Sequence, residues 1–341
     1  MRETSIERAK LGVAAIGLGV GEAHARAYLA TGRCELRWLY DVDAARARNL
    51  IKQLGAGNEA TSIEEILTDP EVDVVSIASY DDAHFDQVVA VLQAGKHVFV
   101  EKPLCRTLEE LRAVKTAWSA AGEPQLTSNL VLRAAPLFRW LKRAIDAGEF
   151  GESYAFDGDY LYGRIEKITD GWRTRVEDYS VMLGGGVHLV DLMLWLTGQR
   201  PVAVSAVGVR ICTRGTAFQY PDHVSATFQF ASGLIGRITA NFGCVHPHQH
   251  VVRVFGTRGT FLYDDQGPRL SRGRDPSVPP QRLELSARPS SKGDLIPWFI
   301  EGVLGDKDRR GFTQHEFDVI SVCSAADRAL IAGRPIEVEY A

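Results

Sequence analysis

The fold prediction starts from the stretch AAIGLGVGEAHARAYLATG, residues 14–32. It begins with apolar, β-forming residues and continues, after a group of glycines, with the pattern of a helix. Gly17, Gly19 and Gly21 form the junction. Glycines let the backbone turn sharply, and the free N–H groups at a helix start can bind phosphate. The usual dinucleotide-binding spacing is G-x-G-x-x-G, and this turn is one residue shorter. Any strand–helix junction can need glycine, so the neighbouring elements must support the interpretation.

The same strand–helix alternation continues over residues 11–131. We expect strands at 11–17, 35–41, 72–79, 97–101 and 125–130, and helices at 21–31, 43–54, 62–68, 81–94 and 107–121. Most of these strands are almost continuously apolar, which indicates a parallel sheet covered by helices on both faces. The fold class is therefore α/β, and this part is a Rossmann-type, doubly wound domain over residues 1–128.

A different pattern fills residues 129–341. A helix near 134–146 is followed by strands expected at 152–162, 202–211, 223–231, 234–242 and 250–262, with a hairpin at Ser232-Gly233. We read 267–293 as a surface loop or partly disordered segment, and 313–332 as a last helix. Strands without intervening helices favour an α+β domain with a large, mainly antiparallel, open sheet.

Composition limits the function classes. The chain has 341 residues and a net charge of −4, which favour about two domains and exclude the basic footprint of a nucleic-acid-binding protein. We expect no secretory signal and no membrane span. The five cysteines are scattered without metal-ligand or redox spacing, so reduced thiols and a cytoplasmic location are expected.

The second strand ends in an acid that supports the nucleotide interpretation. Asp41 lies 20 residues after Gly21, where the ribose-binding acid of a dinucleotide site belongs. A carboxylate there repels a 2′-phosphate and favours NAD over NADP. Asp41 could instead cap the next helix, but Asp43 is better placed for that. Arg46 and Arg48 keep a 2′-phosphate, and hence NADP, within reach.

The stretch VFVEKPLC, residues 98–105, ends a buried strand in two charges and a proline. In an open parallel sheet, ligands bind at the carboxyl ends of strands, where Glu101 and Lys102 lie. Pro103 keeps Lys102 out of the α conformation and permits a cis bond. A solvated strand end is the alternative, which the preceding apolar residues disfavour.

One apolar helix carries two polar residues. From Val187 to Leu196 every residue is apolar except His188 and Asp191, which are one helical turn apart. The buried carboxylate needs a partner, and a satisfied core His–Asp pair is the plain alternative. Three glycines at 184–186 predict open space near His188, which could then accept a proton from an alcohol.

With these motifs, the chain resembles the glucose–fructose oxidoreductase / inositol dehydrogenase / MocA family of NAD(P)-dependent oxidoreductases. The resemblance rests on AGKHVFVEKPL (94–104), GGGVHLVDLMLWLTG (184–198), IGLGVGEAHARAY (16–28), SNLVLRAAP (128–136), GWR (171–173) and VFGTRGTF (254–261). It implies a hydride-transfer enzyme for a sugar, polyol or nucleotide-linked sugar. It also implies a second domain, 129–341, that binds substrate and forms a homodimer or homotetramer through its sheet.

The resemblance assigns residues by position. Lys102 and His188 match the catalytic lysine and histidine. The expected cofactor-binding residues are Gly17, Leu18, Gly19, Val20, Gly21, Asp41, Ser79, Tyr80, His84, Glu101, Lys102, Asn129, Trp172 and Arg173. The expected substrate-binding residues are Lys102, Arg173, His188 and Asp191, and no metal is expected.

One departure from the family pattern concerns the acid that relatives often carry four residues before the histidine. That position is Gly184 here, and the candidates to compensate are Asp178, Tyr179, Asp191 or the substrate itself. The alternatives to a simple dehydrogenase are an NAD-requiring glycoside hydrolase that recycles its cofactor internally, and a non-catalytic ligand sensor.

Overall fold

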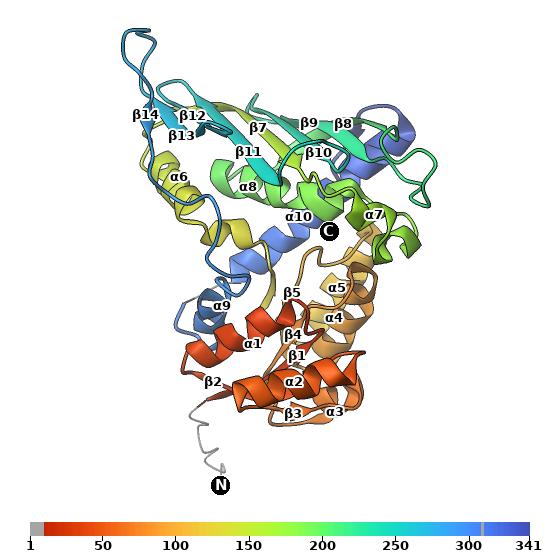
Figure 1. The fold of residues 1–341 in the computed structure, drawn as a ribbon. Coiled ribbons are helices and arrows are strands. Elements are labelled where there is room, and N and C mark those ends of the chain that lie inside the picture. Colours follow the sequence, from red (N-terminus) through yellow and green to blue (C-terminus); the bar gives the residue numbers. More distant parts are fainter. Residues whose placement is uncertain (1–9, 308–309) are drawn as a thin grey trace. The chain divides into compact units, whose positions relative to one another are not determined.

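The computed structural model describes residues 10–307 and 310–341. The chain forms two compact units, shown by colour along the sequence in Figure 1. The first unit contains the residues up to Val131 and also Ser290–Glu316, and the second contains Leu132–Pro289 and Phe317–Ala341. The sequence analysis had assigned the returning segment Ser290–Glu316 to the second domain.

The first unit is built on a six-stranded sheet with the order β3-β2-β1-β4-β5-β6, in which every pairing is parallel. This confirms the doubly wound α/β prediction. The strands are β1 (Leu11–Ile16), β2 (Cys34–Tyr40), β3 (Asn58–Glu59), β4 (Val74–Ile77), β5 (His97–Val100) and β6 (Leu126–Ser128). The sequence analysis missed only β3, which has two residues and no pattern to detect.

The helices of this unit agree with the predicted ones within a few residues. They are α1 (Gly21–Ala30), α2 (Ala44–Leu54), α3 (Ile63–Thr68), α4 (His84–Gln93) and α5 (Leu108–Ala120), with a 3₁₀ turn at Asp81–Ala83 before α4. The returning segment adds α9 (Ile296–Val303), for which the sequence analysis made no prediction. Phe299 of α9 packs against Phe99 of β5, with 5.4 Å between ring centroids.

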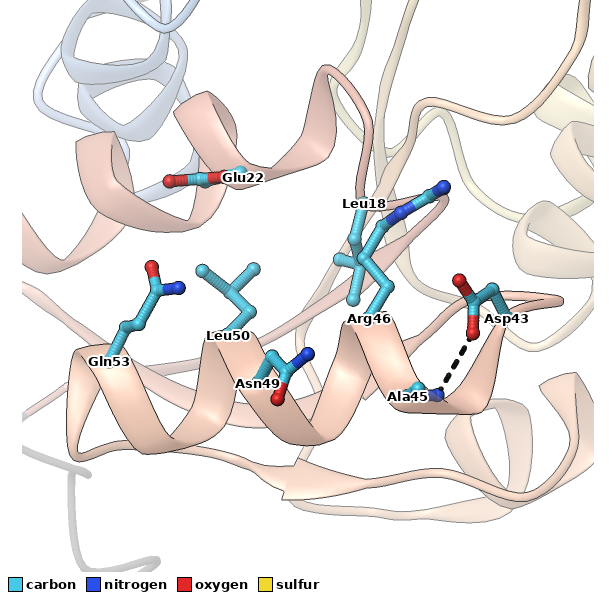
Figure 2. A pocket seen from close by; sticks show the side chains of 8 residues that line it. All are labelled: Leu18, Glu22, Asp43, Ala45, Arg46, Asn49, Leu50 and Gln53. Atoms are coloured by element: carbon cyan, nitrogen blue, oxygen red, sulfur yellow. Dashed lines mark hydrogen bonds between the residues drawn. The ribbon is translucent and has the colours of Figure 1, made fainter.

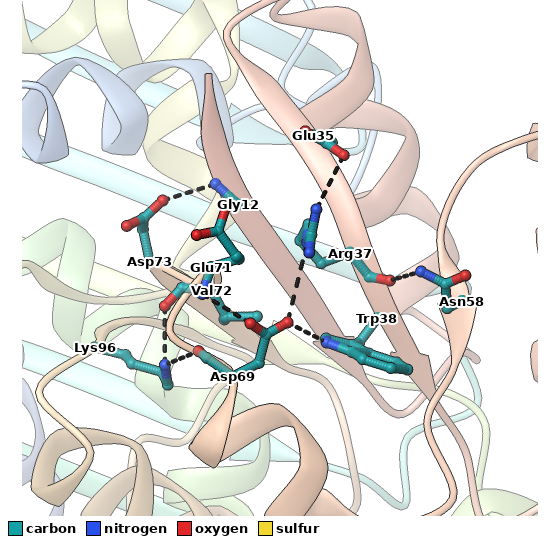
Figure 3. A network of polar contacts seen from close by, with 10 residues as sticks. All are labelled: Gly12, Glu35, Arg37, Trp38, Asn58, Asp69, Glu71, Val72, Asp73 and Lys96. Carbon is teal, nitrogen blue, oxygen red and sulfur yellow. Dashed lines mark hydrogen bonds and ion pairs between the residues drawn. The ribbon is translucent and has the colours of Figure 1, made fainter. Parts of the chain in front are cut away.

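A buried polar network ties together the edge where the parallel strands begin (Figure 3). The Lys96 ammonium donates to the carbonyls of Asp69 and Val72 at 2.8 and 2.9 Å. The Asp69 carboxylate accepts the indole N–H of Trp38 at 2.6 Å. The opposite edge, where the strands end, carries the predicted ligand-binding residues.

The second unit contains a nine-stranded sheet with the order β14-β13-β12-β11-β7-β10-β9-β8-β15. The strands are β7 (Ser153–Leu161), β8 (Pro201–Val209), β9 (His223–Phe230), β10 (Ile235–Asn241), β11 (Gln249–Gly256), β12 (Thr260–Asp264), β13 (Gly267–Ser271), β14 (Gln281–Arg282) and β15 (Ile336–Glu337). β7 and β10 pair in parallel, and the other pairings are antiparallel. The prediction of a mainly antiparallel sheet is therefore confirmed.

Two predictions for this sheet were wrong in detail. The single strand expected at 250–262 is two strands, because the chain turns between β11 and β12, where the Gly256 N–H donates to the Gly259 carbonyl at 2.8 Å. The segment 267–293 was read as a loop, yet β13 and β14 extend the sheet from it. The many prolines and serines of this segment are typical of turns, and its two strands are too short to be recognised from the sequence.

Helices of the second unit cover one face of the sheet, as Figure 1 shows for α6 (Pro136–Asp146) and α8 (Val187–Thr197). A π-helical turn, Met182–Gly186, leads into α8, and α7 (Glu166–Thr169) and a 3₁₀ turn at Trp172–Arg175 precede it. The long helix α10 (Arg310–Ala332) continues from the first unit into the second. In the described ranges, no helix has the length and apolar character needed to cross a membrane.

Candidate active site

The glycine turn between β1 and α1 requires glycine at its first position. Gly17 has a φ of +80°, and a Cβ there would lie 2.5 Å from the Ala78 carbonyl oxygen of the neighbouring strand end. Gly19 has open space where a side chain would project. Within the described residues, the N–H groups of Gly19, Val20 and Gly21 have no protein acceptor. Free donors at a helix start are what a pyrophosphate needs.

Asp41 connects this turn to the following helix. Its carboxylate accepts the Leu18 N–H at 2.7 Å and the Asp43 N–H at 2.9 Å, and it pairs with Arg46 at 3.1 Å. The Leu18 N–H is therefore occupied by protein. Asp43 accepts the Ala45 N–H and caps α2, as the sequence analysis preferred.

A cavity of about 230 Å³ opens between α1 and α2 beside this acid (Figure 2). Its lining consists of Leu18, Glu22, Asp43, Ala45, Arg46, Asn49, Leu50 and Gln53. The Arg46 side chain is half exposed at its rim while it holds the buried Asp41. Arg46, which was predicted to reach a 2′-phosphate, thus forms an ion pair with Asp41, which was predicted to repel one.

Glu101, at the end of β5, belongs to a buried network. Its carboxylate accepts the Asn129 amide at 2.6 Å and lies 3.3 Å from Nε2 of His24, whose Nδ1 bonds to Ser76. Burial alone would raise the pKa of Glu101, but His24 and Asn129 outweigh it and lower the pKa to about 2. The Asn129 amide also donates to the Lys292 carbonyl at 2.7 Å, which ties the returning segment to this network.

Lys102 is the second residue after β5, which places it at the carboxyl edge of the sheet, and its side chain is partly exposed. The peptide bond between Lys102 and Pro103 is cis. The buried imidazole of His84 contacts two carbonyl oxygens, Pro103 at 2.7 Å and Ser79 at 3.2 Å. It thus joins the turns that follow β4 and β5, and it fixes the chain beside Lys102.

Two buried polar atoms at the end of β6 bear on whether the first unit could bind a cofactor. The Ser128 hydroxyl and the Asn129 side-chain oxygen have no hydrogen-bond partner among the described residues. An unpaired buried polar atom is costly unless a ligand satisfies it. Together with the free donors of the glycine turn, these atoms fit an extended dinucleotide at the carboxyl edge of the sheet.

The prediction that the three glycines leave open space beside His188 was wrong, because other side chains fill that space. A Cβ on Gly184 would lie 2.3 Å from the Tyr179 hydroxyl, and one on Gly185 would lie 2.2 Å from the Tyr160 ring. The glycines therefore let two tyrosines pack directly against the π-helical turn. His188 follows this turn and is 7 % exposed, with its ring 6.5 Å from that of Tyr160.

Tyr179 connects this turn to the predicted cofactor residues of the second unit. The Arg173 guanidinium donates to the Tyr179 hydroxyl at 3.0 Å and lies over the Trp172 ring at 4.4 Å. Asp178, another candidate to replace the missing acid, is exposed. Of the three candidates, Tyr179 is the one whose polar atom lies against Gly184.

The buried carboxylate of Asp191 has a charged partner in Arg133. Arg133 donates to it from Nε at 2.8 Å, and both side chains are buried. The carboxylate is fully inaccessible, so this geometry does not support the predicted contact of Asp191 with substrate. No signal in the sequence pointed to Arg133, which is 58 residues away.

Sequence reasoning also missed two histidines near His188. His250 and His248 lie on and just before β11, and their rings are 5.0 Å apart. The His250 ring is 5.6 Å from that of His188. The closely spaced histidines in HPHQH, residues 246–250, were the available signal. Across the described ranges, no group of histidine, cysteine and acidic residues could hold a metal ion.

Comparison with known proteins identifies both units. Residues 11–127 match the family described as "Oxidoreductase family, NAD-binding Rossmann fold", and residues 138–262 match the "GFO/IDH/MocA C-terminal domain". The chain belongs to the GFO/IDH/MocA family of oxidoreductases. The family resemblance, the fold class and the oxidoreductase assignment made from sequence are confirmed.

Named members of the GFO/IDH/MocA family include sugar and inositol enzymes. The chain is 33% identical to 1,5-anhydro-D-fructose reductase of Ensifer adhaerens, over 69% of this chain and 67% of that protein. It is 28% identical to scyllo-inositol 2-dehydrogenase (NAD(+)) of Bacillus subtilis (strain 168), over 84% and 80%.

Solved structures share the fold. A levoglucosan dehydrogenase in complex with NADH superposes with a TM-score of 0.83 at 21% identity, covering 97% of this chain and 99% of that one. An NAD binding oxidoreductase from Klebsiella pneumoniae has a TM-score of 0.84 at 24% identity, covering 97% and 100%. At these identities the likeness concerns the fold.

Proposed function

We propose that this family member transfers a hydride between a nicotinamide cofactor and a hydroxyl or keto group of a sugar, polyol or nucleotide-linked sugar. One observation carries the proposal: the free donors of the glycine turn, Lys102 and the unpaired Asn129 oxygen all lie at the carboxyl edge of one parallel sheet. Ligands of doubly wound sheets bind at this edge. Relatives named for anhydrofructose and inositol support the substrate class.

NAD is the proposed cofactor, preferred over NADP. The N–H groups of Gly19, Val20 and Gly21 would bind its phosphates, and Asp41 would accept the adenosine ribose hydroxyls. Ser79, Tyr80, His84, Trp172 and Arg173 remain the proposed lining of the cofactor site. Asp41 disfavours a 2′-phosphate by charge, and Arg46 would have to leave Asp41 to bind one.

The chain's own residues supply proton handling and charge stabilisation. Lys102 donates a hydrogen bond to the reacting oxygen and stabilises the negative charge that develops there. His188 removes the hydroxyl proton during oxidation and returns it during reduction. The nicotinamide ring, when bound, accepts or donates the hydride. Arg173 would contact the substrate, and Tyr179 would occupy the place of the missing acid.

A lysine substitution tests the proposal. Lys102→Met should lower kcat by about 10²- to 10³-fold, as expected when one preorganised donor is lost. NAD binding, measured by calorimetry, should persist. The assay follows the absorbance of NADH over sugars, polyols and sugar nucleotides. Lys52→Met, on an exposed position of α2, is the matched control and should be unchanged.

The outcome also separates the alternatives. Near-normal turnover of Lys102→Met would defeat the lysine assignment. Conversion of a glycoside without net NADH would indicate internal recycling of the cofactor. Ligand binding without turnover on any tested compound would indicate a sensor.

We further propose a homodimer or homotetramer that assembles through the nine-stranded sheet, and a cytoplasmic location. The sheet supports the first proposal because helices cover one of its faces, while Val207 and Ile235 are exposed at 72% and 52%. All five cysteines are free thiols, which suits a reducing compartment.

A further inference from the structure

A row of nitrogen-bearing side chains leads away from His188 within the second unit. The His250 ring lies 5.6 Å from His188, and the His248 ring lies 5.0 Å from His250. Arg164 ends the row, because its guanidinium lies 3.2 Å from Nδ1 of His248. The proposed proton acceptor is thus joined by successive side-chain contacts to an exposed cation.

Two tyrosines fix this row. His250 on β11 stands opposite Tyr160 on β7, and their rings meet edge to face at 5.1 Å. Tyr162 meets His248 edge to face at 5.5 Å. Both tyrosines are nearly buried, whereas both histidines are partly exposed. A ligand beside His188 would therefore meet the imidazoles, with the tyrosines supporting them from behind.

Arg164 is an exposed cation that pairs with no acidic residue among those described. Its guanidinium lies 4.4 Å from the Tyr162 ring centroid, and it bonds to His248. No carboxylate among the described residues lies within ion-pair distance of it. In contrast, Arg237 and Arg253 on the same sheet both pair with Asp159.

A fixed guanidinium beside imidazole donors is suited to an oxyanion. We propose that Arg164, His248 and His250 form an anion subsite, so that the substrate carries a phosphate or carboxylate beyond the carbon that reacts at His188. This inference rests on the proposed function for the position of the reacting carbon. It narrows the proposed class of sugars, polyols and nucleotide-linked sugars to its acidic or phosphorylated members.

The test compares anionic and neutral probes on the full chain. Glucose 6-phosphate and glucose 1-phosphate represent phosphate, glucuronate and gluconate represent carboxylate, and glucose is the neutral reference. The wild type should prefer at least one anionic probe to glucose in kcat/KM. Arg164→Gln should raise KM for that probe about 10- to 100-fold, as expected for the loss of one charge-assisted hydrogen bond, and change KM for glucose less than twofold.

Controls separate charge recognition from folding. Arg175→Gln removes an exposed arginine of the neighbouring 3₁₀ turn and should leave all KM values unchanged. Arg164→Lys keeps the positive charge but loses the planar set of N–H donors of the guanidinium. Its KM for the anionic probe should lie between those of the wild type and Arg164→Gln. Preference for glucose, or an equal rise of KM for all probes in Arg164→Gln, would overturn the subsite.

The subsite can also be judged if the proposed function fails. If no probe produces NADH, calorimetry with the same anionic probes measures binding directly. Binding that weakens at least tenfold in Arg164→Gln and is retained in Arg175→Gln supports the subsite. Absence of binding by every anionic probe, or binding unaffected by Arg164→Gln, rejects it.

Discussion

At the residue scale, Glu101 and Lys102 explain why a buried strand ends in two opposite charges. Neighbouring residues of an extended chain point in opposite directions. Glu101 contacts His24 and Asn129 in the interior, and its side chain is only 12 % exposed. Lys102 follows it at the carboxyl edge, where His84 contacts the Pro103 carbonyl and fixes the chain. The acid is thus a buried anchor for the segment that carries the proposed donor.

The low pKa of Glu101 predicts a pH dependence of stability. Its folded-state pKa of about 2 lies below the ordinary value of 4.5. The carboxylate therefore stabilises the fold fully above the ordinary pKa, and this contribution, about 3 kcal/mol, is lost as the pH falls from about 4.5 to 2. In urea unfolding, Glu101→Gln should be less stable than the wild type at pH 6, and the difference should shrink toward pH 3.

The control for this titration is Glu109→Gln, which removes an exposed glutamate from α5. Its stability should follow the wild type at every pH. A constant difference between Glu101→Gln and wild type from pH 6 to pH 3 would contradict the assigned pKa.

The Asp191–Arg133 pair predicts a loss of stability. Asp191→Ala leaves a buried guanidinium without its partner, which should cost about 3–5 kcal/mol. The double variant Arg133→Met/Asp191→Leu removes both charges and should recover most of this loss. Unfolding in urea measures both. A large rise in KM with unchanged stability in Asp191→Ala would restore Asp191 as a substrate contact.

At the element scale, the π-helical turn before α8 sets the position of His188. Met182–Gly186 is π-helical and fully buried, and its glycines accept Tyr179 and Tyr160 at distances that no side chain would permit. Single π-helical turns inside α-helices are frequent at functional sites. The close packing makes the orientation of His188 depend on two aromatic residues that lie elsewhere in the sequence.

Adding one methyl group to this turn should therefore affect both stability and turnover. Gly185→Ala places a Cβ 2.2 Å from Tyr160, so the ring or the turn must move. We expect a destabilisation of about 1–3 kcal/mol, typical of overpacking, and at least a tenfold lower kcat. Gly273→Ala, which meets no atom within 4 Å, is the control. Wild-type kcat in Gly185→Ala would show that the turn does not position His188.

At the scale of the whole molecule, the second unit has a sheet face suited to self-association. The α8 side of the sheet takes the buried residues of β9, such as Val224, Ala226 and Phe228. The opposite face carries Arg237 and Asp159, which pair at 3.2 Å, together with exposed aliphatic residues. The proposed oligomer would bury these aliphatic side chains.

Substitutions on this face test the proposed oligomer. Light scattering after size-exclusion chromatography should give a dimer or tetramer for the wild type. Val207→Asp/Ile235→Asp should shift it toward monomer, because two buried carboxylates would oppose association. Val278→Asp, in the exposed segment between β13 and β14, is the control and should leave the oligomeric state unchanged. A monomeric wild type would reject the proposal.

Features that depend on neighbouring residues could be predicted from the amino-acid sequence. Apolar runs gave the parallel strands, the glycine spacing located the turn at Gly17, Asp43 marked the helix cap, and the motif around Lys102 identified the family. Each of these signals lies within a few residues of the feature that it predicts, because backbone geometry and strand ends are local properties.

Contacts between side chains that are distant in the sequence could not be predicted and became visible in the folded chain. Tyr160 and Tyr179 fill the space that three glycines had suggested was open, Arg133 binds the buried Asp191, and residues 290–316 return to the first unit. β13 forms by pairing with β12, and β14 forms by pairing with β13. Such contacts depend on long-range packing and burial. The pattern of residues within one segment does not identify the distant residues that it will contact.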